Sequence, residues 1–180
     1  ADLYAKAQER NPEDFRIPFN RGVSLYRLGD YAAAATAFSE AAKTEDPELQ
    51  ADAYYNLGNA LWQLGREALE GDQPAAREHW NEALGKYQTA LEIDPESADA
   101  RHNLDALRTR IAALPMYDLT LRADPPFGGT VSEGGRFDRG VEVPVKAEAD
   151  PGYQFVEWKG EGVAEPKEPE TSITMTADTE

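Results

Sequence analysis

The chain has 180 residues with 34 acidic and 18 basic side chains, and it contains no cysteine. The excess of acid argues against nucleic acid and anionic membrane surfaces as partners, because both need a basic surface, and it leaves open either a basic partner segment or plain solubility. The lack of cysteine excludes disulfides and thiolate chemistry, and no run of about twenty apolar residues predicts direct membrane insertion.

A repeat runs through the first half of the chain. Residues 20–41 read NRGVSLYRLGDYAAAATAFSEA, and NLGNALWQLG begins at Asn56, so Gly22 and Gly58 occupy equivalent places 58 − 22 = 36 residues apart. A period of this length predicts stacked helical hairpins rather than one closed globule. Because a solenoid presents an extended face, binding is the expected activity.

The two ends of the predicted solenoid differ. Tyr4, Ala7 and Pro12 have the spacing of the aromatic, alanine and proline residues that close the last helix pair, so residue 1 falls within a predicted helix and we expect a part of a longer protein. Residues 97–114 are predicted to form a capping helix. Ser97 is a suitable N-cap there, and an apolar stripe faces the solenoid while charged residues face outward.

Small residues at four places should let the two helices of each hairpin approach closely. These are Gly22, Ala41, Gly58 and Ala90. Large residues should fill the space between the helices. These are Phe38, Tyr54, Leu57 and Tyr87.

The repeat resembles the tetratricopeptide family, which pairs a first and a second helix in each unit. The second unit carries the resemblance most clearly, with Tyr54, Leu57, Gly58 and Leu61 on one helix and Trp80, Ala83, Tyr87, Ala90 and Pro95 on the other. The resemblance implies an all-α tetratricopeptide solenoid over residues 1–115, with a partial N-terminal unit, two full units and the capping helix.

The second full unit is longer than the family standard. Its closing proline would be due at residue 82 but occurs at Pro95, so 95 − 82 = 13 extra residues lie within the helix pair. Apolar spacing continues on both sides, which predicts that both helices are lengthened. Gly71 suits a left-handed end of the first helix, and Asp72 and Pro74 suit the start of the second. A docking finger and an elaboration without function both remain open.

Composition changes after Leu114. Pro115 ends the helical pattern, and alternating apolar residues predict strands over 117–123, 141–149, 153–158 and 171–177. Pro144 should place its strand at a sheet edge or in a bulge, because proline lacks the N–H that a central strand donates.

The string PPFGGTVSEGGRFDRGVEVPVKAEADPGYQFVEWKGEG, which begins at Pro125, resembles the divergent internalin B-repeat family of bacterial surface and envelope proteins. The resemblance implies a small β-rich, β-grasp-like domain over residues 116–180. In so small a domain, Tyr153, Phe155 and Trp158 are expected to serve as core or near-core anchors.

The tetratricopeptide resemblance also implies a concave groove, lined by the first helices of successive units, that would hold an extended partner segment. The groove residues it indicates are Arg16, Phe19, Asn20, Val23, Arg27, Tyr55, Asn56, Asn59, Trp62, Gln63, His102 and Asn103, with Arg110 as a further candidate. Asn20, Asn56 and Asn103 hold the same place in each unit. Such amides can bond a peptide backbone as donor and acceptor, or they can brace neighbouring helices.

A closer resemblance of the helical half is to the tetratricopeptide segment of bacterial Bat (aerotolerance operon) proteins. It rests on YNLGNAL from Tyr55, the lengthened hairpin, and the string DARHNL from Asp99. It implies the periplasmic or envelope portion of a membrane-associated protein, with envelope proteins such as those with von Willebrand factor A-type domains as partners.

Catalysis has little support in the sequence. His79 and His102 fall on different predicted helices, no nucleophile motif is present, and no cluster has metal-ligand spacing, so we expect no enzyme, no cofactor and no metal. The prediction is a non-catalytic envelope scaffold that binds a partner protein. The alternative is a structural or adhesive module that forms a homodimer, with the β domain as spacer.

Overall fold

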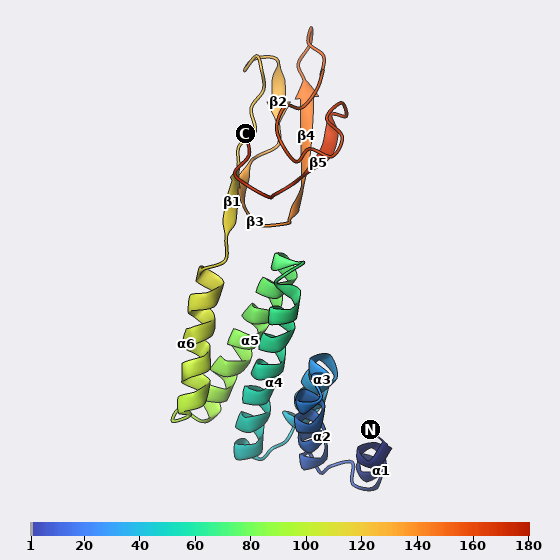
Figure 1. The fold of residues 1–180 in the computed structure, drawn as a ribbon, viewed down its shortest axis with the longest axis vertical. Helices are drawn as coiled ribbons and strands as arrows, with labels where there is room; N and C mark the ends of the chain where they lie inside the picture. Colours follow the sequence, from blue (N-terminus) through green and yellow to red (C-terminus); the bar gives the residue numbers. More distant parts are fainter. Residues whose placement is uncertain (1) are drawn as a thin grey trace. The chain divides into compact units, whose positions relative to one another are not determined.

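The computed structural model describes residues 2–180 and divides the chain into two compact units, Ala1–Ala113 and Leu114–Glu180. The described part of the first unit consists of six α-helices, and the second consists of short strands and turns (Figure 1). The predicted fold class, a helical tetratricopeptide-like region followed by a small β-rich domain, is confirmed.

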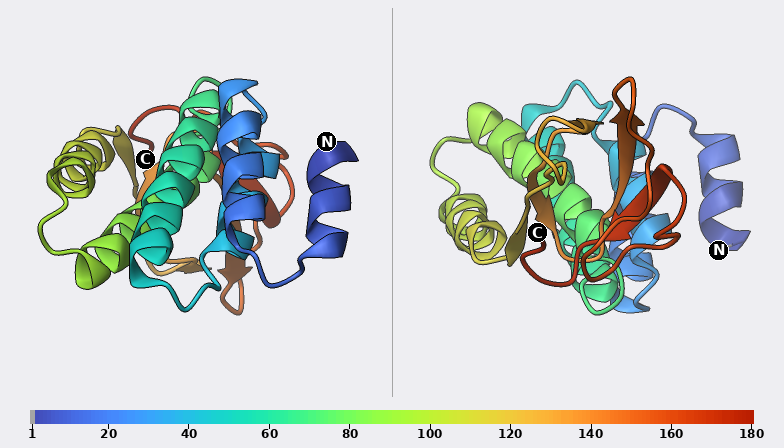
Figure 2. Two further views of the ribbon diagram at one scale, coloured as in Figure 1. Left: turned by 90° about the horizontal axis from the view of Figure 1, so that it is seen from below. Right: turned by 90° about the horizontal axis from the view of Figure 1, so that it is seen from above.

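Successive helices of the first unit lie side by side in chain order (Figure 2). The helices are α1 (Asp2–Arg10), α2 (Arg16–Arg27), α3 (Tyr31–Ala41), α4 (Pro47–Ala68), α5 (Gln73–Ile93) and α6 (Ala98–Ala112). The first full pair is α2 and α3, which have 12 and 11 residues, and the second is α4 and α5, which have 22 and 21. Both helices of the second pair are therefore lengthened, as predicted.

Side-chain caps fix where four of the helices begin. Asp30, Asp46, Asp72 and Ser97 each accept a hydrogen bond from a backbone N–H in the first turn of α3, α4, α5 and α6. A capped N–H would otherwise have no partner within the helix. The caps at Asp72 and Ser97 are as predicted, but Gly71 is not left-handed, and its N–H instead bonds the carbonyl of Ala68 at 3.1 Å.

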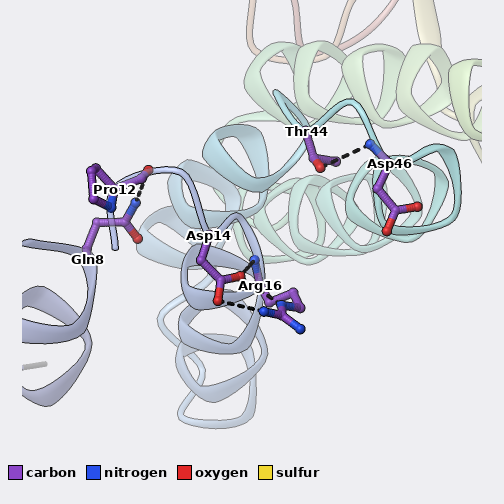
Figure 3. Close-up of polar contacts among 6 residues, drawn as sticks. All are labelled: Gln8, Pro12, Asp14, Arg16, Thr44 and Asp46. Atoms are coloured by element: carbon purple, nitrogen blue, oxygen red, sulfur yellow. Dashed lines mark hydrogen bonds and ion pairs between the residues drawn. The ribbon is translucent and has the colours of Figure 1, made fainter. Parts of the chain in front are cut away.

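The turns that join the early helices are closed by local polar contacts (Figure 3). The amide of Gln8 donates to the carbonyl of Pro12 at 3.1 Å, and the backbone N–H of Asp46 donates to Thr44 at 3.2 Å. At the start of α2, the guanidinium of Arg16 donates two hydrogen bonds to the carboxylate of Asp14, at 2.8 and 2.9 Å. These bonds define the turns that set each helix against the next.

Within each pair, an aromatic ring lies over a glycine of the opposite helix. A Cβ atom at Gly22 would lie 2.7 Å from the ring of Phe38, and one at Gly58 would lie 2.6 Å from the ring of Tyr87. Ala41 and Ala90 are buried beside them. The predicted close approach of the helices is therefore confirmed, because no larger residue would leave room for the rings.

The second unit contains two small antiparallel sheets. Strand β1 (Met116–Leu119) pairs with β3 (Gly135–Asp138), and β4 (Glu142–Ala149) lies between β2 (Gly129–Val131) and β5 (Glu170–Thr174). The bridge from Leu119 to Thr179 is parallel and brings the end of the described chain beside β1.

Pro144 lies at a local edge, as predicted. It pairs with Ser172 of β5, whereas β2 pairs only with residues 147–149 of β4, so that no strand faces the other side of Pro144. The missing N–H therefore breaks no ladder hydrogen bond.

Two expectations for this unit were wrong. Residues 153–158 form no strand, and β2 and β3 form strands that the alternation did not indicate. The core consists of Leu119, Val143, Val145, Ile173 and Met175, against which Trp158 packs. Tyr153 is 45% exposed and lies against Phe127 rather than in the core.

Candidate peptide-binding face

The twelve predicted groove residues lie on α2, α4 and α6, the first helices of successive pairs, and we call this set the first-helix face. Four of them, Arg16, Asn20, Arg27 and His102, are exposed. The other eight are half-buried, and none is sealed in the interior.

A polar network joins α4, α5 and α6 on this face. The amide of Asn103 donates to Oδ1 of Asn59 at 3.0 Å and to the hydroxyl of Tyr55 at 3.3 Å. The hydroxyl of Tyr87, on α5, donates to the same Oδ1 at 2.8 Å. Asn59 and Asn103 therefore brace neighbouring helices, which is the structural alternative that the sequence left open.

The Tyr87 hydroxyl stays a neutral donor in this network. Burial of the phenol raises the pKa of Tyr87 well above its ordinary value, and the nearby hydroxyls of Tyr55 and Tyr26 raise that pKa further. The bond to Asn59 is therefore present throughout the physiological pH range.

A second link joins α2 to α4. The amide of Gln63 donates to the hydroxyl of Tyr26 at 3.0 Å and accepts from Arg66 at 2.8 Å. The same guanidinium lies 5.5 Å from the centre of the Trp62 ring, within cation–π range. This end of the face thus combines an indole, a cation and an amide, which are groups that recognise polypeptide.

The three asparagines at equivalent places behave differently. Asn103 forms the network, whereas Asn56 donates to the carbonyl of Asp52 in its own helix at 2.8 Å, and Asn20 is exposed. The same place in the repeat thus has a different environment in each unit, and the bracing role left open by the sequence is seen for Asn103.

Two predicted residues are already engaged by local structure. Phe19 packs edge to face on Phe38, with ring centres 5.7 Å apart, and joins the core beside Ala53. Arg16 forms the ion pair with Asp14, which lowers the pKa of Asp14 through the hydrogen bond. Val23 is half-buried on α2.

Sequence reasoning missed Tyr26, which completes the link between α2 and α4. A signal was present, because Tyr26 and Trp62 are 62 − 26 = 36 residues apart, so the repeat places them at equivalent positions. Trp62 was assigned to the groove from the family pattern, and its counterpart should have been assigned with it.

The surroundings of Asp52, on α4, disfavour the charged form of its carboxylate. Partial burial raises the pKa of Asp52, and the carboxylates of Glu48 and Asp94 raise it further. The position one repeat earlier, 52 − 36 = 16, is Arg16. These equivalent positions of α2 and α4 therefore carry opposite charges.

The described residues offer neither a metal centre nor a membrane-spanning helix. Residues 2–180 contain no group of three histidine, cysteine or acidic side chains placed to hold a metal ion. None of the described helices is long and apolar enough to cross a bilayer.

Comparison with protein families identifies both units. A tetratricopeptide-repeat model matches residues 1–49 and 19–77. Tetratricopeptide repeats are therefore present within residues 1–77 of the helical unit. A model of the divergent InlB B-repeat domain matches residues 119–180, which cover nearly all of the second unit. A search of curated proteins found no match. Tetratricopeptide repeats typically serve as non-catalytic scaffolds for protein partners, so this chain carries a scaffold element beside a B-repeat domain.

Proposed function

We propose that the helical unit binds an extended segment of a partner protein on the first-helix face. The single observation that supports this most is that none of the twelve residues is fully buried, so their amide, aromatic and cationic groups are accessible on one face. The network of Tyr55, Asn59, Tyr87 and Asn103 holds α4, α5 and α6 in fixed positions. A preorganised face loses little conformational entropy on binding.

The residues that would contact the partner are those that the fold does not use. Asn20, Arg27 and His102 are exposed, and Trp62 presents part of its indole. The amide of Asn20 can donate to and accept from a peptide backbone, which suits recognition of an extended segment with tolerance of its sequence. The twelve residues of the first-helix face include no lysine and only two arginines, Arg16 and Arg27, so we do not expect a clamp for a terminal carboxylate.

The test selects twelve-residue peptides from a random displayed library on the purified chain and measures their affinity by fluorescence anisotropy. Asn20→Ala, Trp62→Ala and His102→Ala should each weaken the selected peptides by about tenfold, the loss of one well-formed contact. Asn81→Ala and Gln88→Ala, at exposed places on α5, are matched controls that should leave the affinity unchanged.

Circular dichroism of each variant separates loss of binding from loss of fold. The proposal fails if selected peptides bind the face variants as tightly as the parent chain, or if the α5 controls weaken them equally.

The cellular setting is part of the same proposal. The B-repeat match favours a bacterial surface or envelope location, and an envelope partner such as a von Willebrand factor A-type protein follows from the Bat resemblance. Cell fractionation, followed by immunoblotting for the intact protein, tests the location. Recovery in the cytosolic fraction alone would contradict it.

Self-association is the second candidate function. Leu3 and Leu28 are each 82% exposed on the helical unit, and two such apolar side chains favour contact with another copy. Light scattering over a range of concentrations should then show a dimer that Leu28→Asn weakens. A monomer at every concentration would remove this candidate.

A further inference from the structure

The B-repeat unit contains a hollow that the proposed function does not use. It has a volume of about 520 Å³, within the range of about 300–1,000 Å³ that ligand pockets occupy. Two stretches of chain, residues 120–125 and 153–159, form much of its lining. Val131 and residues 147–149, from β2 and β4, also line it.

The backbone along this hollow lacks partners. Within the described chain, residues 121–123 and 154–157 form no backbone hydrogen bond in either direction, although both stretches lie next to paired structure. Peptide N–H and C=O groups in such a position bind water or a further strand. The two stretches therefore resemble two sheet edges with room for a further strand between them.

In both stretches half-buried and exposed side chains alternate, as they do along a strand with one face toward solvent. Leu121 and Ala123 are half-buried while Arg122 is exposed, and Phe155 is half-buried between exposed neighbours. Val156, which lines the hollow, is 69% exposed, and Phe127, whose ring lies against that of the lining residue Tyr153, is 70% exposed. An added strand with apolar residues at alternate positions would cover these groups and extend the core.

Parallel pairing is already present beside β1. The N–H of Thr179 donates to the carbonyl of Asp118, and the N–H of Thr120 donates to the carbonyl of Thr179, both at 2.9 Å. Thr179 thus pairs with the residues just before 121–123. A strand that continued this ladder would run parallel to β1.

The charges at the hollow favour a basic occupant. Its charged lining consists of the carboxylates Asp124, Glu148, Glu157 and Glu180 and the cations Arg122 and Lys159. Arg122 is held by Glu180 at 2.8 Å, while Asp124 and Glu157 form no ion pair with any described residue. Residues 116–180 carry 14 acidic and 6 basic side chains, so the surroundings are also acidic.

We propose that this hollow is a β-augmentation site, which takes an extended segment of another protein, with alternating apolar and basic residues, as a strand between residues 121–123 and 154–157. The apolar side chains would lie against Leu121 and Phe155, and the basic ones would face Asp124 and Glu157. This second interaction surface is independent of the first-helix face.

The experiment uses a labelled, end-blocked peptide of alternating valine and lysine. Its addition should slow hydrogen exchange of the amides of residues 121–123 and 154–157, followed by NMR. The same peptide with N-methyl groups on alternate residues cannot complete the ladder and should bind at least about tenfold more weakly. A valine and glutamate peptide should also bind more weakly.

Matched variants test the charge argument. Glu157→Lys should weaken the valine and lysine peptide by about threefold or more, as expected for exposed charge pairs, whereas Glu133→Lys, away from the hollow, should have no such effect. Equal binding of the N-methylated peptide, or equal effects of the two variants, would overturn the proposal. Slow exchange of these amides in the intact protein without peptide would overturn it as well, because the protein's own chain or a second copy would then fill the site.

Discussion

In both full helix pairs an aromatic ring packs on a glycine of the opposite helix, once in the short pair and twice in the long pair. In the short pair, Phe38 lies over Gly22. In the long pair, Tyr87 lies over Gly58, and Trp80 adds a second contact over Gly65, where a Cβ atom would lie 2.3 Å from the indole. Gly65 lies 65 − 29 = 36 residues after Gly29, which is left-handed beyond the end of α2 and meets no ring, so the longer helix turns a repeated glycine into a second contact.

The comparison shows that the extension enlarges the core. Trp80 is fully buried, its indole N–H donates to the carbonyl of Trp62 at 3.0 Å, and Arg110 of α6 lies 5.1 Å from its ring centre. A finger that projected freely from the solenoid would have no such contacts with α6. The lengthened hairpin is held at its middle, and only its tip is left to serve as a docking element.

The largest expected effect comes from Trp80→Ala. Removal of a fully buried indole should cost about 3–5 kcal/mol of unfolding free energy, from lost apolar burial and from the cavity left behind. Denaturant unfolding followed by circular dichroism at 222 nm measures it. Asn81→Ala, an exposed neighbour on the same helix, should change stability by less than about 0.5 kcal/mol. If Trp80→Ala left the midpoint of the main unfolding transition unchanged, the lengthened hairpin would not be part of the common core.

Gly65→Ala should give the next largest effect. The added methyl group must displace the buried indole of Trp80, so overpacking should cost about 1–3 kcal/mol. Gly85→Ala is the matched control within the same pair, because nothing lies within 4 Å of a Cβ atom there. That change should instead stabilise α5 by about 0.5–1 kcal/mol, the helix propensity of alanine over glycine. Opposite signs in the two melts support the packing account, and equal signs would contradict it.

The sequence predicted this architecture well where repetition carried the information. The 36-residue period located the helix pairs, and Gly58 and Tyr87 were both assigned to the contact between the helices. Gly65 was missed although Gly29 precedes it by 65 − 29 = 36 residues, because Gly29 lies beyond the end of α2 and meets no ring, whereas Gly65 lies within α4. Its role depends on which turn of α5 faces it, which is a tertiary property.

The β unit was harder to predict. Residues 153–158 have the alternation of a strand, but only the two ends of this stretch form backbone hydrogen bonds, from Tyr153 to Asp150 and from Trp158 to Pro166, so no ladder is present. Conversely, β2 and β3 are three and four residues long, too short for alternation to be recognised. On the first-helix face, the sequence indicated the three asparagines but not which one reaches a neighbouring helix.

The smallest expected effect contrasts equivalent places of the two pairs, Arg16 and Asp52. The ion pair with Arg16 lowers the pKa of Asp14, whereas burial and the nearby carboxylates raise that of Asp52. A raised folded-state pKa means that the folded chain binds the proton more tightly than the unfolded chain, so this contribution to stability falls as pH rises through that pKa. Asp52→Asn should therefore stabilise the helical unit at pH 7, by less than about 1 kcal/mol at so exposed a place.

Thermal melts of parent and variant at several pH values check this contrast. The gain from Asp52→Asn should disappear as the pH falls through the raised pKa of Asp52, because the parent carboxyl is then neutral too. Asp14→Asn is the counterpart in the short pair and should have the opposite sign, with a loss at pH 7 that disappears once acid has neutralised Asp14 in the parent. If both variants shifted the melting temperature in the same direction at pH 7, the change of charge between equivalent positions would not act on stability, and the two pairs would differ in packing alone.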